Sequence, residues 1–277
     1  ELLKLLAKIF DEEHLFSQKS LSDFIPYLEK LEQYKQVRIQ EPVIQKLTVS
    51  ALDGELERTS ANRTVHPSDH LKVAPYAYQE EGILFGLYKK SLLIGDEMGL
   101  GKTLQAIGLG VLKKEIFGFK NILVVTLSSL KQQWQREIER FSNEQGCIIG
   151  GSAKQRKEQY HTDTSLFKIT NYEAVLRDVT IISRLKPDLI ILDEAQRIKN
   201  FETKTAEAVK SIPRQHAIIL TGTPLENKLE DVYSLVQFLD PELLSPLWQF
   251  AADHFLLGRS KKGDILGYIN LNTLHEK

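Results

Sequence analysis

A glycine-rich segment that ends in lysine and threonine contains the residue types that could bind phosphate. It reads GDEMGLGKT, from Gly95 to Thr103, and follows a short apolar run of strand length. Gly99 and Gly101 let the backbone curl closely around an anion, and a helix that begins near Lys102 would aim free amide groups at it. Lys102 would reach the β- and γ-phosphates of a nucleotide, and the Thr103 hydroxyl would ligate Mg²⁺. The segment therefore predicts a site for ATP and Mg²⁺.

This loop departs from the usual phosphate-binding motif at one position, because Asp96 stands where that motif has its first glycine. The alternative is an ordinary glycine-rich turn between a strand and a helix, with an incidental lysine. We favour the phosphate loop because the required strand precedes it and the required helix follows it. We expect nucleotide contacts along the whole loop, namely from Asp96, Glu97, Met98, Gly99, Leu100, Gly101, Lys102 and Thr103.

Two acidic residues, Asp193 and Glu194, come directly after the apolar run Leu189 to Leu192. If that strand lies beside the strand of the phosphate loop, Asp193 can hold Mg²⁺ directly or through water. Glu194 can then orient and deprotonate an attacking water. In isolation, such a pair is most often a solvated turn. Together with a phosphate loop it predicts nucleotide hydrolysis, with Lys102 and Glu194 as catalytic residues.

Short apolar runs alternate with helix-length amphipathic segments from Pro75 onward. This alternation predicts βαβ units, and hence an α/β fold with a parallel sheet covered by helices on both faces. Ligands bind beyond the carboxyl ends of the strands in such sheets, which is where the phosphate loop and the acidic pair lie. The expected strands are Leu92 to Ile94, Ile122 to Val125, Phe167 to Ile169, Leu189 to Leu192 and Ala217 to Leu220.

Three motifs along the chain resemble, in the same order, those of the Swi/Snf-type translocase ATPases, which are superfamily 2 helicase-like proteins. They are DEMGLGKT (96–103), DEAQRIKN (193–200) and TGTPLENKLEDVYSLVQFLDPELL (221–244). The resemblance covers residues 74–244 and implies a RecA-like P-loop domain, the first of the two lobes of such a motor. It also implies that Thr221, Gly222 and Thr223 transmit the nucleotide state to the nucleic-acid-binding surface.

The same resemblance implies roles for two glutamines. Gln196 replaces the histidine of the DEAH-type box, and its side-chain amide could still couple the nucleotide to the next motif, so we count it among the catalytic residues. Gln79, in PYAYQEEGILFGL (75–87), matches the glutamine that contacts adenine, and an amide can both donate to and accept from the edge of that base. From composition alone, Gln79 would be a glutamine on a helix surface.

Two further segments would face nucleic acid if the resemblance holds. LVVTLSSLKQQWQREI (123–138) contains Ser128 and Ser129, and ITNYE (169–173) contains Thr170 and Asn171. Short hydroxyl side chains with nearby backbone amides suit phosphate contacts that position a protein without reading sequence. Ordinary capping of the helices that follow accounts for these residues almost equally well. We expect Trp134, in the first segment, to pack a helix rather than to stack on a base.

The resemblance implies a parent protein that uses ATP to translocate along duplex DNA and to remodel protein–DNA complexes. The second RecA-like lobe of the same parent chain and a protein bound to the DNA would be its further partners. No second series of apolar strands follows Asp240, so we expect a first lobe with weak or no turnover by itself. The alternative is a nucleotide-gated nucleic-acid-binding scaffold with negligible hydrolysis. The presence of Lys102, Asp193 and Glu194 argues against this alternative. The third motif disfavours a small-molecule P-loop kinase.

Patterning divides the chain into an accessory region (1–72), with two short helices within residues 1–40, then the ATP-binding domain (73–244) and the start of a helical protrusion (245–277). The net charge of −1 neither supports nor excludes a nucleic-acid partner. A single cysteine, Cys147, rules out an intrachain disulfide. No apolar run approaches the roughly 18 to 20 residues that span a bilayer. We expect no membrane partner, and a cytoplasmic protein of a prokaryote or a nuclear one of a eukaryote.

Overall fold

The computed structural model describes residues 65–201, 203–222, 228–241, 243–257 and 265–270 of the 277-residue chain. Contacts divide the chain into two compact units, Glu1–His66 and Pro67–Lys277. All helices and strands of the described residues belong to the second unit. The helices expected within residues 1–40 lie outside the described residues, as does Thr223.

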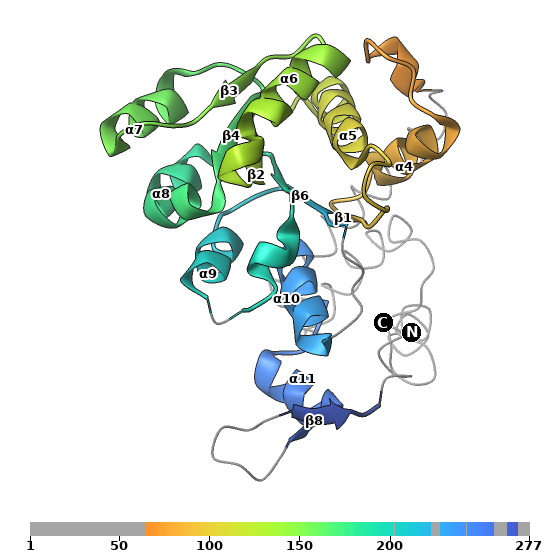
Figure 1. Cartoon of the computed structure of the whole chain (residues 1–277), viewed down its shortest axis with the longest axis vertical. Coiled ribbons are helices and arrows are strands. Elements are labelled where there is room, and N and C mark those ends of the chain that lie inside the picture. The colour runs from red at the N-terminus through yellow and green to blue at the C-terminus, as the bar shows by residue number, and fades with distance from the viewer. Residues whose placement is uncertain (1–64, 202, 223–227, 242, 258–264, 271–277) are drawn as a thin grey trace, which may run out of the picture. The chain divides into compact units, whose positions relative to one another are not determined.

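A six-stranded parallel sheet forms the centre of the second unit (Figure 1). Its strands are β1 (Ser91–Ile94), β2 (Ile122–Thr126), β3 (Gly146–Ile148), β4 (Phe167–Asn171), β5 (Leu189–Leu192) and β6 (His216–Leu220). Every residue of β2, β4, β5 and β6 is buried, as expected for strands covered on both faces. The predicted α/β fold and its five strands are confirmed, and β3 adds an edge strand that was not predicted.

Helices cover both faces of this sheet. They are α4 (Ala77–Leu87), α5 (Lys102–Phe117), α6 (Lys131–Phe141), α7 (Ala153–Thr162), α8 (Tyr172–Leu185), α9 (Lys204–Lys210) and α10 (Leu229–Leu239), with the 3-10 helices η2 (Pro67–Asp69), η3 (Ser128–Leu130) and η4 (Ala195–Ile198). On one face α5 packs between α4 and α6, and on the other α8 packs against α7 and α9, with α10 beside α9 (Figure 1). Within the described ranges, no helix combines the length and the apolar character that crossing a bilayer requires.

The strand order places β6 between β1 and β5. Along the sheet the order is β1-β6-β5-β2-β4-β3. Ser91 pairs with Ala217 and Ile94 with Leu220, while the other edge of β6 pairs with β5. The expectation that the strand before Asp193 lies beside the strand of the phosphate loop is therefore corrected. Apolar runs identify strands but not their neighbours, and the consequence is that the segment after β6 lies between the loop and Asp193.

A helix and a strand pair follow the sheet in the described part of residues 245–277. Helix α11 (Leu247–His254) leads into β7 (Phe255–Leu257), which pairs antiparallel with β8 (Ile265–Tyr268). Tyr233 of α10 packs with Phe250 and Phe255 in a small cluster. This region was expected to be helical, so the strand pair is a departure. Its apolar runs span only three and four residues, too few to show a strand period.

A buried lysine contacts a buried histidine where β6 begins. Nζ of Lys113 donates hydrogen bonds to the carbonyl oxygens of Leu87 (2.7 Å) and Lys89 (2.9 Å) and lies 3.0 Å from Nδ1 of His216. Burial, and after it the charge of Lys113, lowers the pKa of His216 to about 3. Burial also lowers the pKa of Lys113 to about 7. At neutral pH His216 is therefore uncharged in the folded protein.

We expect His216→Gln to weaken the dependence of stability on acid pH. Between pH values of about 3 and the usual histidine pKa of about 6.5, the unfolded chain takes up a proton that the folded protein cannot hold at His216. The free energy of unfolding of wild type therefore falls as the pH drops, by up to about 2 to 3 kcal/mol from this residue between about pH 6.5 and 4.5. Urea unfolding at both pH values measures it, with the exposed His161→Gln as the control. The same pH dependence in all three proteins would contradict the prediction.

Candidate nucleotide-binding site

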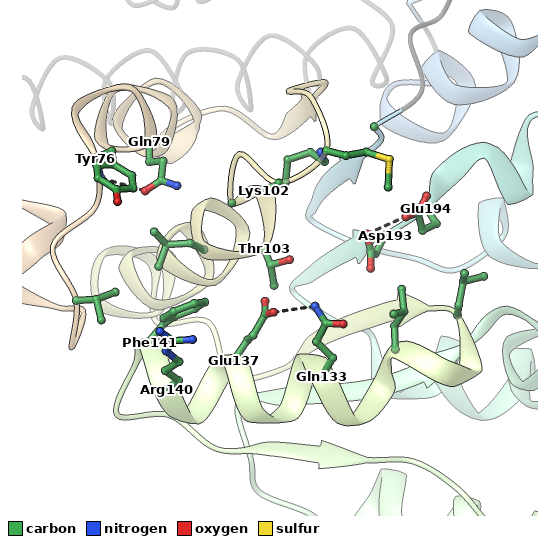
Figure 2. A pocket seen from close by; sticks show the side chains of 18 of the residues that line it. Tyr76, Gln79, Lys102, Thr103, Gln133, Glu137, Arg140, Phe141, Asp193 and Glu194 are labelled. Atoms are coloured by element: carbon green, nitrogen blue, oxygen red, sulfur yellow. Dashed lines mark hydrogen bonds between the residues drawn. The ribbon is translucent and has the colours of Figure 1, made fainter.

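A cavity of about 880 Å³ opens where the phosphate loop meets the segments that follow β5 and β6 (Figure 2). One end of it, here called the phosphate end, holds Lys102 and Thr103 together with Asp193 and Glu194. Tyr76 stands at the opposite end. The other lining residues are Val73, Ala74, Gln79, Met98, Gly99, Gly101, Leu104, Leu127, Leu130, Gln133, Glu137, Arg140, Phe141, Gln196 and Gly222. The tertiary structure thus brings the loop and the acidic pair to one cavity.

The phosphate loop closes on its own lysine. Gly99 and Gly101 have φ values of +87° and +73°, a left-handed conformation that residues with a side chain rarely adopt. Nζ of Lys102 donates hydrogen bonds to the carbonyl oxygens of Asp96 (2.7 Å) and Glu97 (2.9 Å). Helix α5 begins at Lys102, so the unpaired amide groups of its first turn are available to an anion in the cavity.

Three residues predicted to contact the nucleotide do not line the cavity. The Asp96 carboxylate accepts a hydrogen bond from Nε2 of Gln105 (2.6 Å), which ties the loop to α5. Glu97 contributes the carbonyl oxygen that holds Lys102, and Leu100 contributes a carbonyl oxygen that accepts from the side chains of Tyr78 and Gln79. Asp96, Glu97 and Leu100 therefore shape the loop, while the other predicted loop residues line the cavity.

Gln79 joins the start of α4 to the phosphate loop. Its side chain is buried, with Oε1 accepting a hydrogen bond from the backbone amide of Tyr76 (3.0 Å) and Nε2 donating to the carbonyl oxygen of Leu100 (3.0 Å). A Cβ atom at Gly101 would lie 2.4 Å from that Nε2, so the loop needs glycine there for space as well as for φ. Gln79 lines the cavity near Tyr76 (Figure 2), and its contact with adenine stays a prediction.

Asp193 is held through both of its carboxylate oxygens. Oδ2 accepts hydrogen bonds from Oγ1 of Thr126 (2.8 Å) and Nε1 of Trp134 (2.8 Å), and Oδ1 accepts from the backbone amide of Glu194 (3.0 Å). Burial raises the pKa of Asp193 above its usual value, and the hydrogen bonds from Trp134 and Thr126 oppose that rise. The carboxylate is therefore held in one orientation at the phosphate end of the cavity, where its oxygen atoms could act as ligands.

The chain turns out of β5 at Glu194. This residue has φ 52° and ψ 50°, a left-handed conformation that costs free energy for a residue with a side chain and that clusters at functional sites. Its Oε2 accepts a hydrogen bond from Nε2 of Gln196. Oε1 of Gln196 is buried and, within the described ranges, has no hydrogen-bond partner. Glu194 and Gln196 therefore form a polar pair that lines the phosphate end.

The segment after β6 touches the phosphate loop directly. The backbone amide of Thr221 donates a hydrogen bond to the carbonyl oxygen of Ile94 (3.1 Å), the last residue of β1. A Cβ atom at Gly222 would lie 2.9 Å from Cγ of Met98 and 3.5 Å from Nζ of Lys102. Gly222 therefore lies close to Met98 and Lys102 of the phosphate loop. The coupling role of Thr221, Gly222 and Thr223 stays a prediction.

The four candidate nucleic-acid contacts separate into two exposed and two buried residues. Ser128 and Ser129 are exposed in η3, just before α6. Thr170 is fully buried in β4, where its Oγ1 accepts a hydrogen bond from the Tyr160 hydroxyl (3.2 Å). Asn171 is also buried, and its Nδ2 donates to Oε2 of Glu173 (2.6 Å). The prediction of direct phosphate contacts is kept for the two serines and withdrawn for Thr170 and Asn171.

One face of α6 lines the cavity, which sequence reasoning did not foresee. Gln133, Glu137 and Arg140 recur at helical spacing, and Nε2 of Gln133 donates to Oε1 of Glu137 (2.8 Å). In Figure 2 this face runs from the phosphate end towards Tyr76. The spacing could have identified a common face. It could not show that the face borders the nucleotide cavity, nor that Trp134 of the same helix bonds to Asp193.

Residues 78–256 match the model of the SNF2-related domain. The DNA repair and recombination protein RAD54B of Gallus gallus is 33% identical over 188 residues, 61% of this chain and 20% of that protein. The ISWI chromatin-remodeling complex ATPase ISW1 of Saccharomyces cerevisiae is 32% identical over 189 residues, 65% of this chain and 17% of that protein. The chain therefore spans a fifth or less of the length of these relatives.

A solved structure is also similar to this chain. The Sulfolobus solfataricus SWI2/SNF2 ATPase core in complex with dsDNA has 30% sequence identity and a TM-score of 0.60, covering 66% of this chain and 39% of that chain. The region matched by the family model contains the phosphate loop, the acidic pair and the segment after β6. Most residues that line the cavity therefore lie within the region that matches the family model.

Proposed function

Because the chain belongs to the SNF2-related domain family, we propose that it forms the ATP-binding lobe of a DNA-dependent ATPase. The whole protein would translocate on duplex DNA and remodel protein–DNA complexes. One observation carries the proposal: the phosphate loop and the pair Asp193 and Glu194 line a single cavity. The names of the similar proteins, an ATPase core bound to dsDNA and a chromatin-remodeling ATPase, support the same class of activity.

ATP would lie along the cavity, with its phosphates at Lys102 and Thr103 and its base near Tyr76 and Gln79. A volume of about 880 Å³ suits a ligand of this size. Lys102 would transfer its hydrogen bonds from loop carbonyl oxygens to phosphate oxygens, which are charged and therefore stronger acceptors. The first turn of α5 would add backbone amides to the same phosphates.

Thr103 and Asp193 would hold Mg²⁺. A hydroxyl and a carboxylate line the same end of the cavity, and Mg²⁺ prefers oxygen ligands, keeping water and substrate phosphates as the rest. Two protein ligands are enough for such a site. When bound, Mg²⁺ would neutralise charge that develops on the phosphates.

Glu194 would accept a proton from the attacking water. Its carboxylate is oriented by Gln196 and lines the phosphate end. Both residues follow β5 closely, with Glu194 directly before η4 and Gln196 within it, so the base and its orienting partner belong to one short segment. A change in the position or protonation of this carboxylate would alter its hydrogen bond with Gln196, and through Gln196 it would affect the neighbouring segments. This is the coupling role proposed for Gln196.

Duplex DNA and a second RecA-like lobe would complete the motor. Ser128 and Ser129 offer exposed hydroxyls for phosphate contacts. The second lobe of the same parent chain would supply arginines to the reaction, and the loss of such an arginine costs about 10³- to 10⁵-fold in rate. A protein bound to the DNA would be the object that is moved. The motor would act where the DNA is, in the cytoplasm of a prokaryote or the nucleus of a eukaryote.

The decisive experiment is ATP turnover by the full-length protein, measured with and without duplex DNA. We expect turnover that rises when duplex DNA is added, because Ser128 and Ser129, the proposed DNA contacts, lie between Leu127 and Leu130, which line the nucleotide cavity. ATP binding without turnover under either condition would contradict the motor. It would favour the nucleotide-gated nucleic-acid-binding scaffold instead.

A further inference from the structure

Side chains from two different segments converge on one oxygen of Asp193. Oγ1 of Thr126, the last residue of β2, and Nε1 of Trp134, in the middle of α6, both donate to Oδ2 at 2.8 Å. A third donor, the Tyr172 hydroxyl at the start of α8, bonds to the backbone carbonyl oxygen of the same aspartate at 2.7 Å. Asp193 is therefore held from the strand, from α6 and from α8.

The buried indole of Trp134 makes a hydrogen bond in addition to its packing contacts. Its side chain is only 2% exposed, so its N–H needs a partner, as buried indoles usually have. The partner is the carboxylate of Asp193, which lines the phosphate end of the cavity. With Oδ2 occupied by two donors, the orientation of the carboxylate plane is determined, and Oδ1 is left with one backbone amide.

We propose that Trp134 and Thr126 are positioning residues for Asp193, which hold its carboxylate in the orientation that receives Mg²⁺ with the nucleotide. The inference rests on the proposed ATP site. Partners of this kind orient metal ligands, and their removal typically costs about 10- to 100-fold in metal affinity. The hydrogen bond from Trp134 to Asp193 also connects α6 directly to the proposed metal site. Helix α6 follows the exposed Ser128 and Ser129 and lines the cavity.

The test measures nucleotide affinity in Mg²⁺ and in EDTA for wild type, Thr126→Val, Trp134→Phe and the double variant. Valine keeps the volume of threonine but removes the donor, and phenylalanine keeps an aromatic ring but removes the N–H. ADP is the probe, and titration calorimetry is the readout, so no turnover is needed. The quantity compared is the factor by which Mg²⁺ raises the affinity for ADP over that in EDTA. We expect this factor to be about tenfold smaller in each single variant than in wild type, and close to 100-fold smaller in the double variant. Affinity in EDTA should stay unchanged.

The control for loss of an indole is Trp248→Phe, which removes a tryptophan of α11 that is 74% exposed and outside the cavity. A fall in affinity that is equal in Mg²⁺ and EDTA, or no fall in any variant, overturns the positioning role. If Trp134→Phe does not fold, Thr126→Val still tests the positioning role, because valine has nearly the same volume as threonine. Wild type that binds no ADP in either buffer would refute the proposed ATP site itself, which is a different outcome from equal binding by wild type and variants.

Discussion

Lys102→Ala is expected to lower ATP turnover by about 10²- to 10³-fold, the usual cost of removing one positioned donor from a reacting site. The Lys102 ammonium stands at the phosphate end, where it bonds to the carbonyl oxygens of Asp96 (2.7 Å) and Glu97 (2.9 Å). Alanine can neither close the loop nor supply a charge to the phosphates. Nucleotide affinity should therefore fall together with turnover.

The measurement is turnover by the full-length protein, wild type and variant, with and without duplex DNA, beside thermal unfolding of both proteins. The control is Lys154→Ala, which removes an exposed lysine of α7 that does not line the cavity. The prediction requires the loss to appear in Lys102→Ala alone, with DNA present or absent. If the variant folds and its turnover matches that of wild type, the phosphate role of this lysine is refuted.

Glu194→Gln is expected to lower turnover by about 10²- to 10⁴-fold, the contribution of a general base, while nucleotide binding survives. Glutamine has the same shape as glutamate, and its carbonyl oxygen can still accept the hydrogen bond from Nε2 of Gln196. It cannot take a proton from water. The variant should therefore bind ATP and retain it, in contrast to Lys102→Ala, which should bind it weakly.

Single-turnover hydrolysis and a separate ATP-binding titration distinguish these two effects for Glu194→Gln. The matched control is Glu158→Gln, an exposed glutamate of α7 whose side chain lies outside the cavity. Hydrolysis at the wild-type rate by Glu194→Gln would assign the base to another residue. Equal loss of binding and hydrolysis would instead mean that Glu194 shapes the site rather than reacting in it.

The residues that meet in the candidate site could be picked out from the sequence because their signals are local. The loop from Gly95 to Thr103 requires glycine at positions whose φ is positive, and such a requirement is visible in a few consecutive residues. The acidic pair after β5 is equally local, since a buried apolar run followed by charge marks the carboxyl end of a strand. The five main strands followed from the same alternation.

The candidate nucleic-acid contacts show where local reasoning fails. Ser128 and Thr170 are both short hydroxyl residues near the end of a strand, yet the first is exposed and the second is completely buried. Thr170 lies within β4, all of whose residues are buried, and accepts a hydrogen bond from Tyr160 of α7, whereas Ser128 lies beyond β2 in η3. A helix that packs from elsewhere in the chain leaves no mark in the segment it covers.

The sequence by itself determined the parallel α/β fold, the phosphate loop and the acidic pair, because glycine conformations, apolar periodicity and strand-end charge are properties of short segments. Only the tertiary structure decided that β6 separates β1 from β5 and that Gly222 lies against Met98 and Lys102. It also decided that Trp134 bonds to Asp193, 59 positions away in the chain. Strand order and side-chain contacts depend on how distant segments pack, and packing free energy belongs to the assembled core rather than to any one segment.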